Sequence, residues 1–132
     1  MNIEEAIHQR WADDEALGAA LPAENVVTGL RSGRQVPYAT VHRKQNRTVL
    51  RTNAGELDET TLLIHVWHDD HDAGRAIAEK VQAALDRRQF PLAGQERVVR
   101  MLHTADSAEQ HDDGLWRFSI EFLAQVSLPC GD

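Results

Sequence analysis

The strongest pattern in the chain is an alternation of apolar and polar residues from Leu115 to Leu128. Alternation with a period of two predicts a β-strand with one buried face and one solvent-facing face. Residues Thr60–His68 predict a second strand, and this one is apolar on both faces, which is typical of a strand covered on both sides. Two further strands are expected over Val36–His42 and Arg97–His103.

A different spacing, of three and four residues, predicts helices at two places. After Asn2, a suitable N-cap with Glu5 three residues later, apolar residues recur on one helical face: Ile3, Ala6, Ile7 and Trp11. Asp13 or Asp14 can cap a further short helical turn that Pro22 ends. A second long helix is expected from a cap at Asp69, Asp70 or Asp72 to about Arg88.

These elements predict an α+β domain with the order α-β-β-α-β-β. Two helices packed on one face of a mostly antiparallel four-stranded sheet would bury both kinds of apolar face. We expect one domain over residues 1–132, with a core at about 3–127 and a tail at 128–132. Residues 23–35, with turn formers Gly29, Ser32 and Gly33, are expected to be a loop. Residues 43–57 are expected to be either a long basic loop or an extended hairpin arm.

The distribution of charge is more informative than the net charge of −7. The net charge argues against general nucleic-acid binding. Residues 25–55 hold six basic side chains and no acid: Arg31, Arg34, Arg43, Lys44, Arg47 and Arg51. Residues 56–72 hold six acids and neither Lys nor Arg: Glu56, Asp58, Glu59, Asp69, Asp70 and Asp72. Two segments of opposite charge favour head-to-tail contacts between subunits. Two solvated faces without a partner would explain the same residues.

The residues with potential for chemistry gather between His65 and Asp72. His65, His68, Asp69 and His71 are of the types that bind metals. On a strand, however, His65 and His68 point to opposite faces, and the aspartates are equally suited to cap the following helix. Trp67 lies on the second apolar face of its strand, which either a helix or a neighbouring subunit must cover.

The sequence lacks the motifs of several enzyme classes. The sequence has neither a nucleophile elbow nor a phosphate-binding loop, so we expect no catalytic residues and no cofactor. The single cysteine, Cys130, cannot form an internal disulfide. No apolar stretch reaches the length of a membrane span, and the acidic N-terminus is unlike a signal peptide, which predicts a cytoplasmic origin.

The order of these motifs resembles a known protein family. The motifs are an N-terminal helix containing DDEALGAAL (13–21), VPYATV (36–41), a strand ending IHVW (64–67), a helix beginning DAGRAIAEKV (72–81) and a final GLWRFSIEF (114–122). Together they resemble the tail completion or tail terminator-like proteins of tailed bacteriophages and prophages over roughly residues 3–127. The resemblance implies a compact subunit without catalytic residues. It also implies a ring, typically of six copies, that ends the tail tube and meets the head connector.

The main hypothesis is therefore a structural protein of the virion tail or neck, assembled in the host cytoplasm, whose partners are itself, tail-tube proteins and head-connector proteins. No membrane and no specific nucleic acid are expected as partners. The residues predicted to lie at subunit interfaces are Arg43, Lys44, Arg47, Arg51, Asp69, Asp70, Asp72 and Trp67. The alternatives are a metal-binding domain or metal-dependent enzyme that uses the His65–His71 cluster, and a monomeric adaptor.

Overall fold

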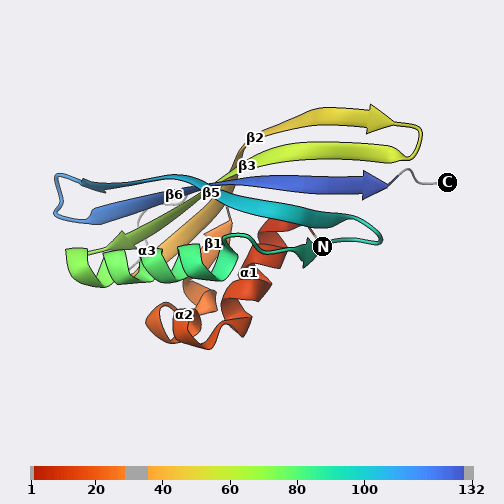
Figure 1. The fold of residues 1–132 in the computed structure, drawn as a ribbon. Coiled ribbons are helices and arrows are strands. Elements are labelled where there is room, and N and C mark those ends of the chain that lie inside the picture. Colours follow the sequence, from red (N-terminus) through yellow and green to blue (C-terminus); the bar gives the residue numbers. More distant parts are fainter. Residues whose placement is uncertain (1, 29–35, 130–132) are drawn as a thin grey trace.

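The computed structural model describes residues 2–28 and 36–129 (Figure 1). In chain order its helices are α1 (Ile3–Asp13), α2 (Glu15–Ala20), the 3-10 helix η1 (Ala23–Asn25) and α3 (His71–Leu85). Its strands are β1 (Val26–Thr28), β2 (Tyr38–Thr52), β3 (Gly55–His68), β4 (Phe90–Pro91), β5 (Arg97–Gln110) and β6 (Trp116–Pro129). Gly29, Arg31, Ser32, Gly33, Arg34 and Cys130, for which the sequence led to expectations, lie outside the described residues.

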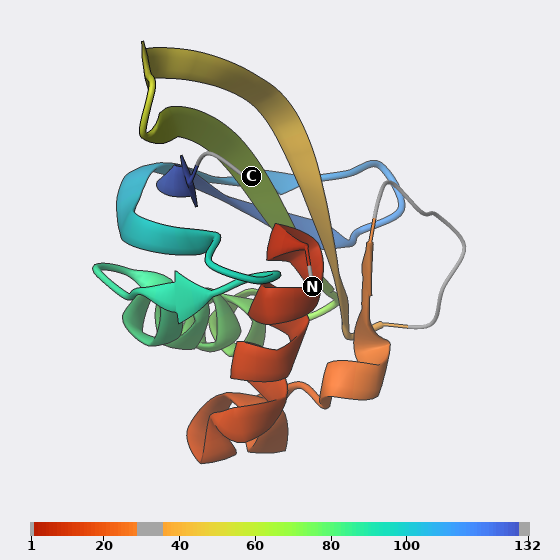
Figure 2. The ribbon, with the colours of Figure 1, turned by 90° about the vertical axis from the view of Figure 1, so that its right-hand side faces the viewer.

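All six strands form one mixed sheet in the order β1-β2-β3-β6-β5-β4. β1 pairs with β2 in parallel, and every other neighbouring pair is antiparallel. The four long strands β2, β3, β6 and β5 form the body of the sheet, and the two shortest strands lie at its edges. The sheet is strongly curled, and α1 lies within the curl (Figure 2).

The helices cover one face of the sheet, which we call the helix face. Alternate residues of the central strands point there, including Leu62, Ile64, Val66, Ile120 and Phe122, and each of these is at most 2% exposed. They form one hydrophobic cluster with α1 and α3, to which the helices contribute Ile7, Trp11, Ile77 and Val81. The other face, which we call the open face, carries no described helix.

The helix ends follow the signals in the sequence. The Asn2 side chain accepts a hydrogen bond from the Glu5 backbone N–H at 2.8 Å, and Asp14 and Asp70 cap α2 and α3 in the same way. Such caps satisfy backbone donors that the first helical turn leaves free. α3 ends at Leu85, three residues before the predicted end, and Arg87 has a positive φ of 63° that a helix cannot contain.

The predicted four-stranded antiparallel sheet in the order α-β-β-α-β-β is wrong. The sheet has six strands, and it is mixed because β1 is parallel to β2. β1 lies in a segment predicted as loop, and β4 lies between the predicted second long helix and the strand predicted from Arg97. These strands have only three and two residues, too few for a recognisable alternation. The long strands also run beyond their predicted ends: β2 continues to Thr52 and β5 to Gln110, through polar residues that carry no apolar pattern.

No helix of the described residues is long and apolar enough to cross a membrane.

Gly74 sets the distance between α3 and β6. A Cβ atom at this position would lie 2.5 Å from Cε2 of Phe118 and 3.0 Å from the His68 Cβ. We expect Gly74→Ala to lower the free energy of unfolding by about 1–2 kcal/mol, because the cost of overpacking exceeds the gain in helix propensity. Urea denaturation measures the change. Gly18→Ala is the control, because its new Cβ meets only the Trp11 carbonyl oxygen at 3.9 Å. A Gly74→Ala variant as stable as Gly18→Ala would contradict this packing.

Candidate functional site

Residues 43–57 form a hairpin that projects beyond the helices, and we call this hairpin the arm (Figure 1). β2 and β3 remain paired up to Thr52 and Gly55 at its tip. All residues of β2 from Arg43 to Thr52 are exposed. The arm also carries Val49 and Leu50, the large hydrophobic side chains with substantial exposure among the described residues, at 41% and 56%. Exposed apolar groups at the end of a projecting hairpin are suited to contact another protein.

The basic side chains of the arm already have acidic partners in their own subunit. Arg47 pairs with Glu59 at 2.7 Å, Arg51 with Glu56 at 2.9 Å, and Lys44 with Glu121 at 3.4 Å. The hydrogen bond from Arg47 holds the pKa of Glu59 below its usual value. Arg47 and Arg51 remain 64% and 71% exposed, so both can still contact a second molecule.

Arg43 has a different position from the other three. Its guanidinium donates two hydrogen bonds, of 2.8 and 3.0 Å, to the carboxylate of Glu4 on α1. The hydrogen bond from Arg43 outweighs burial and lowers the pKa of Glu4. The pair therefore ties the base of the arm to the first helix, which is a structural role.

The acidic turn after β3 lies at the other end of that strand. Asp70 caps α3, while Asp69 and Asp72 contact the rings of His68 and His71 at 3.1 and 3.2 Å. The β5–β6 turn lies at the same end, because His68 pairs with Trp116, the first residue of β6. Residues 104–113, which we call the acidic tip, contain Asp106, Glu109, Asp112 and Asp113 and neither Lys nor Arg. The arm and the acidic tip thus project from opposite ends of the molecule (Figure 1).

Trp67 lies on the open face in a cluster of rings. Its ring stacks on Tyr38 with 5.9 Å between centroids, contacts His111 at 5.0 Å, and lies under the Arg117 guanidinium at 5.8 Å. Several polar atoms on this face are shielded from solvent without a hydrogen-bond partner among the described residues: Thr40 Oγ1, His42 Nδ1, Trp67 Nε1, His111 Nε2 and Arg117 Nε. The open face therefore holds several buried polar atoms that lack a hydrogen bond. Each such atom costs free energy.

The predicted metal cluster is divided between the two faces of the sheet. His65 lies on the open face and hydrogen-bonds to Ser119 Oγ at 2.8 Å, whereas His71 contacts Trp116 and Phe118 on the helix face. Across residues 2–28 and 36–129, no group of three or more His, Cys, Asp or Glu side chains is arranged to hold a metal ion. The structure thus does not bring His65, His68, Asp69 and His71 together.

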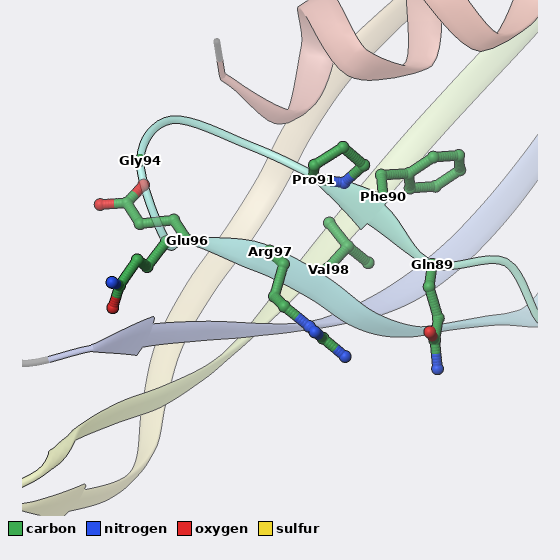
Figure 3. Close-up of a pocket in the computed structure, with 8 residues that line it drawn as sticks. Gln89, Phe90, Pro91, Gly94, Glu96, Arg97 and Val98 are labelled. Atoms are coloured by element: carbon green, nitrogen blue, oxygen red, sulfur yellow. The ribbon is translucent and has the colours of Figure 1, made fainter.

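A hollow of the described surface lies beside the β4–β5 turn. It is open, measures about 500 Å³, and is lined by residues 89–91 and 94–98. The polar ends of Gln89, Glu96 and Arg97 do not converge on one point (Figure 3). This arrangement offers no set of groups that would act together on a substrate.

The sequence did not reveal two features of these ends. The acidic tip lies beyond the end of the strand predicted over Arg97–His103, because its residues have no apolar alternation. Val49 and Leu50 stood in a segment that was left open between loop and hairpin. The one available signal was Thr48-Val49-Leu50, a short stretch of strand-forming residues amid basic ones.

We expect Arg43→Ala to cost about 2 kcal/mol of unfolding free energy, because it leaves the buried Glu4 carboxylate without its charged donor. Arg51→Ala is the matched control, since it removes an exposed pair and should cost less than about 0.5 kcal/mol. Urea denaturation of both variants at neutral pH checks the difference. Equal losses would mean that the Arg43–Glu4 pair does not anchor the arm.

We expect His65 to lower the free energy of unfolding in mild acid. Burial, with smaller contributions from Arg117 and His42, lowers the pKa of His65 from 6.5 to about 4. Between these values the unfolded chain binds a proton that the folded chain does not, so stability falls as the pH decreases from about 6.5 to 4. The loss over this range is roughly 3 kcal/mol. Urea denaturation at several pH values should show a smaller decline for His65→Gln than for the wild type, and parallel declines would contradict this assignment.

Comparisons with known proteins agree with this architecture. The family model of the tail completion protein gp17 matches residues 5–127. One solved structure similar to this chain is a component of the virion of a native gene transfer agent particle, with a TM-score of 0.74 at 18% identity over 95% of this chain and 94% of that one. A second solved chain gives a TM-score of 0.59 at 14% identity over 98% of this chain and 95% of that one. No curated protein matches the sequence.

Identities this low establish a shared fold, whereas the family match extends over nearly the whole chain and confirms the resemblance stated from the sequence. The chain belongs to the tail completion protein gp17 family.

Proposed function

We propose that this protein is a structural component of the tail or neck of a phage or phage-like particle. In this proposal its copies form a ring at the head-proximal end of the tail tube, and the ring meets the head connector. Six copies are favoured, as the family resemblance implies, and assembly takes place in the host cytoplasm. The observation that carries the proposal is the family match over residues 5–127.

The character of the surface supports a structural role over a catalytic one. The features that stand out on the described surface are a projecting arm with exposed Val49 and Leu50, an acidic tip at the far end, and a face without helices. All three suit contacts with other proteins. The similarity to a component of a gene transfer agent virion is in keeping with a particle of this kind.

A ring needs two different surfaces on each subunit, since a cyclic contact of more than two copies is heterologous. In our proposal the arm, with Lys44, Arg47 and Arg51, provides one surface. Asp69, Asp70 and Asp72, with Trp67 nearby, belong to the opposite one. Arg43 contributes by fixing the base of the arm through Glu4. The positions of the two groups at opposite ends of β3 suit a head-to-tail arrangement.

Reversing two arm charges tests this arrangement. We expect Arg47→Glu with Arg51→Glu to raise the concentration for half-assembly by about tenfold or more at low salt, because like charges replace attraction at each contact. Light scattering across a series of concentrations, at low and high salt, measures the mass.

The matched control is Arg87→Glu with Arg88→Glu, which changes the net charge equally at exposed positions after α3, away from the arm. This control should assemble as the wild type does. An unchanged mass in the arm variant would contradict the role of the arm charges, and a wild type that stays monomeric with and without purified tail tubes would contradict the ring.

A further inference from the structure

The sheet has two edges that are each only half covered. β1 pairs with β2 only at residues 39–41, and β4 pairs with β5 only at Arg97 and Val98. The segment after α3 covers a further part of the β5 edge, because the Arg87 N–H donates to the Met101 carbonyl and the His103 N–H donates to Asp86 Oδ1. Along Arg43–Thr52 of β2 and Thr104–Gln110 of β5, no described residue pairs with the outer side of the strand. An uncovered edge presents backbone donors and acceptors that can pair with another strand.

The directions of the two edge segments suit each other. The strands β2, β3, β6 and β5 are antiparallel at every step, so β2 and β5 run in opposite directions. When two copies lie side by side in the same orientation, β5 of one copy is therefore antiparallel to β2 of the next. This contact joins two different edges and can repeat, which is the condition for a closed ring.

The short edge strands restrict how two copies can meet. The free part of β2 is in the arm, whereas the free part of β5 runs into the acidic tip at the other end of the molecule (Figure 1). Two copies must be displaced along the strand direction for these parts to meet. The arm of one copy then lies beside the β5–β6 hairpin of its neighbour.

Charge complementarity indicates a second copy of this chain as the occupant. Residues 43–52 carry four cations and no acid, while residues 104–113 carry four acids and neither Lys nor Arg. Charges also commonly protect strand edges from pairing, but protection does not require opposite signs on the two edges. The exposed Val49 and Leu50 add apolar area on the arm side.

We propose that the arm edge of β2 pairs antiparallel with the β5 edge of a second copy, so that the sheets of neighbouring subunits become continuous. This inference rests on the proposed self-assembly and specifies its interface. The paired region lies within Gln45–Thr48 of one copy and Ala105–Gln110 of the next, two stretches in which each strand keeps one register with its own neighbour. Arg47 lies opposite Glu59 and Glu109 opposite Arg117, on the open face in both cases, so Arg47 and the neighbour's Glu109 come to the same side of the joined sheet. Opposite charges across such a pair stabilise it.

Cross-linking between two single-cysteine variants tests the pairing. Both variants carry Cys130→Ser, and one adds Thr48→Cys and the other Ala108→Cys, two exposed positions that lie opposite each other when Arg47 lies opposite the neighbour's Glu109. The two proteins are mixed and treated with a short bifunctional thiol linker. We expect the Thr48→Cys protein to link to the Ala108→Cys protein and neither to link to itself. The control pairs Thr48→Cys with Gln95→Cys, an exposed position in the β4–β5 turn.

A charge exchange provides an independent readout. Arg47→Glu should weaken assembly, and adding Glu109→Arg should restore it to within about threefold of the wild-type concentration dependence, because the pair re-forms between copies. Arg47→Glu with Glu59→Arg restores only the pair within the subunit and should remain weak.

The outcomes distinguish a failure of the proposed strand pairing from a failure of the proposed function. A ring without the unlike cross-link, or one that Glu59→Arg rescues as well as Glu109→Arg, overturns edge pairing and leaves the proposed function intact. Linking of Thr48→Cys to itself would indicate an arm-to-arm dimer and overturn the proposal. Absence of any assembly, with tail tubes present, counts against both.

Discussion

The pairing of β3 with β6 is the constraint on which the rest of the structure depends. All 14 residues of β3 are in register with β6, and the pairing places Leu62, Ile64 and Val66 beside Phe122, Ile120 and Phe118. These side chains form the floor on which α1 and α3 pack. A shift of one residue would move the whole apolar set to the open face, so burial fixes the register. Gly74 then allows α3 to approach Phe118 closely.

The same pairing produces the two ends that carry the functional proposal. The arm extends past the helices at one end, and at the other end the β5–β6 hairpin lies along the start of α3 (Figure 1). In each hairpin the outer strand is exposed, over residues 43–52 in the arm and 104–110 in the acidic tip. These exposed segments are largely polar and have little apolar burial of their own. Their energetic contribution to the fold is small, which leaves their charges and edges available for contacts with other proteins.

The sequence predicted those parts of the fold that have a hydrophobic period or a cap. It predicted α1 with its Asn2 cap, the start of α3, the apolar half of β3 and nearly all of β6, since burial imposes a pattern there. It did not predict β1 and β4, which are too short to show a period, nor the polar half of β5, and it left the polar half of β2 open between a loop and a hairpin. These polar halves are held by pairing with a neighbour rather than by burial. The basic candidate residues lie in that open segment, whereas Trp67 and the aspartates lie on the predicted strand and turn. Their ion pairs, such as Arg43 with Glu4, join residues far apart in the chain and leave no local signal in the sequence.

The central claim is that copies of this chain join edge to edge into a ring that completes a phage-type tail. Electron cryomicroscopy of the protein bound to the ends of purified tail tubes tests it most directly. The account predicts a closed ring at the tube end in which β2 of each subunit continues the sheet of its neighbour at β5. A single copy at the tube end, or a ring whose subunits meet through their helices, would contradict it.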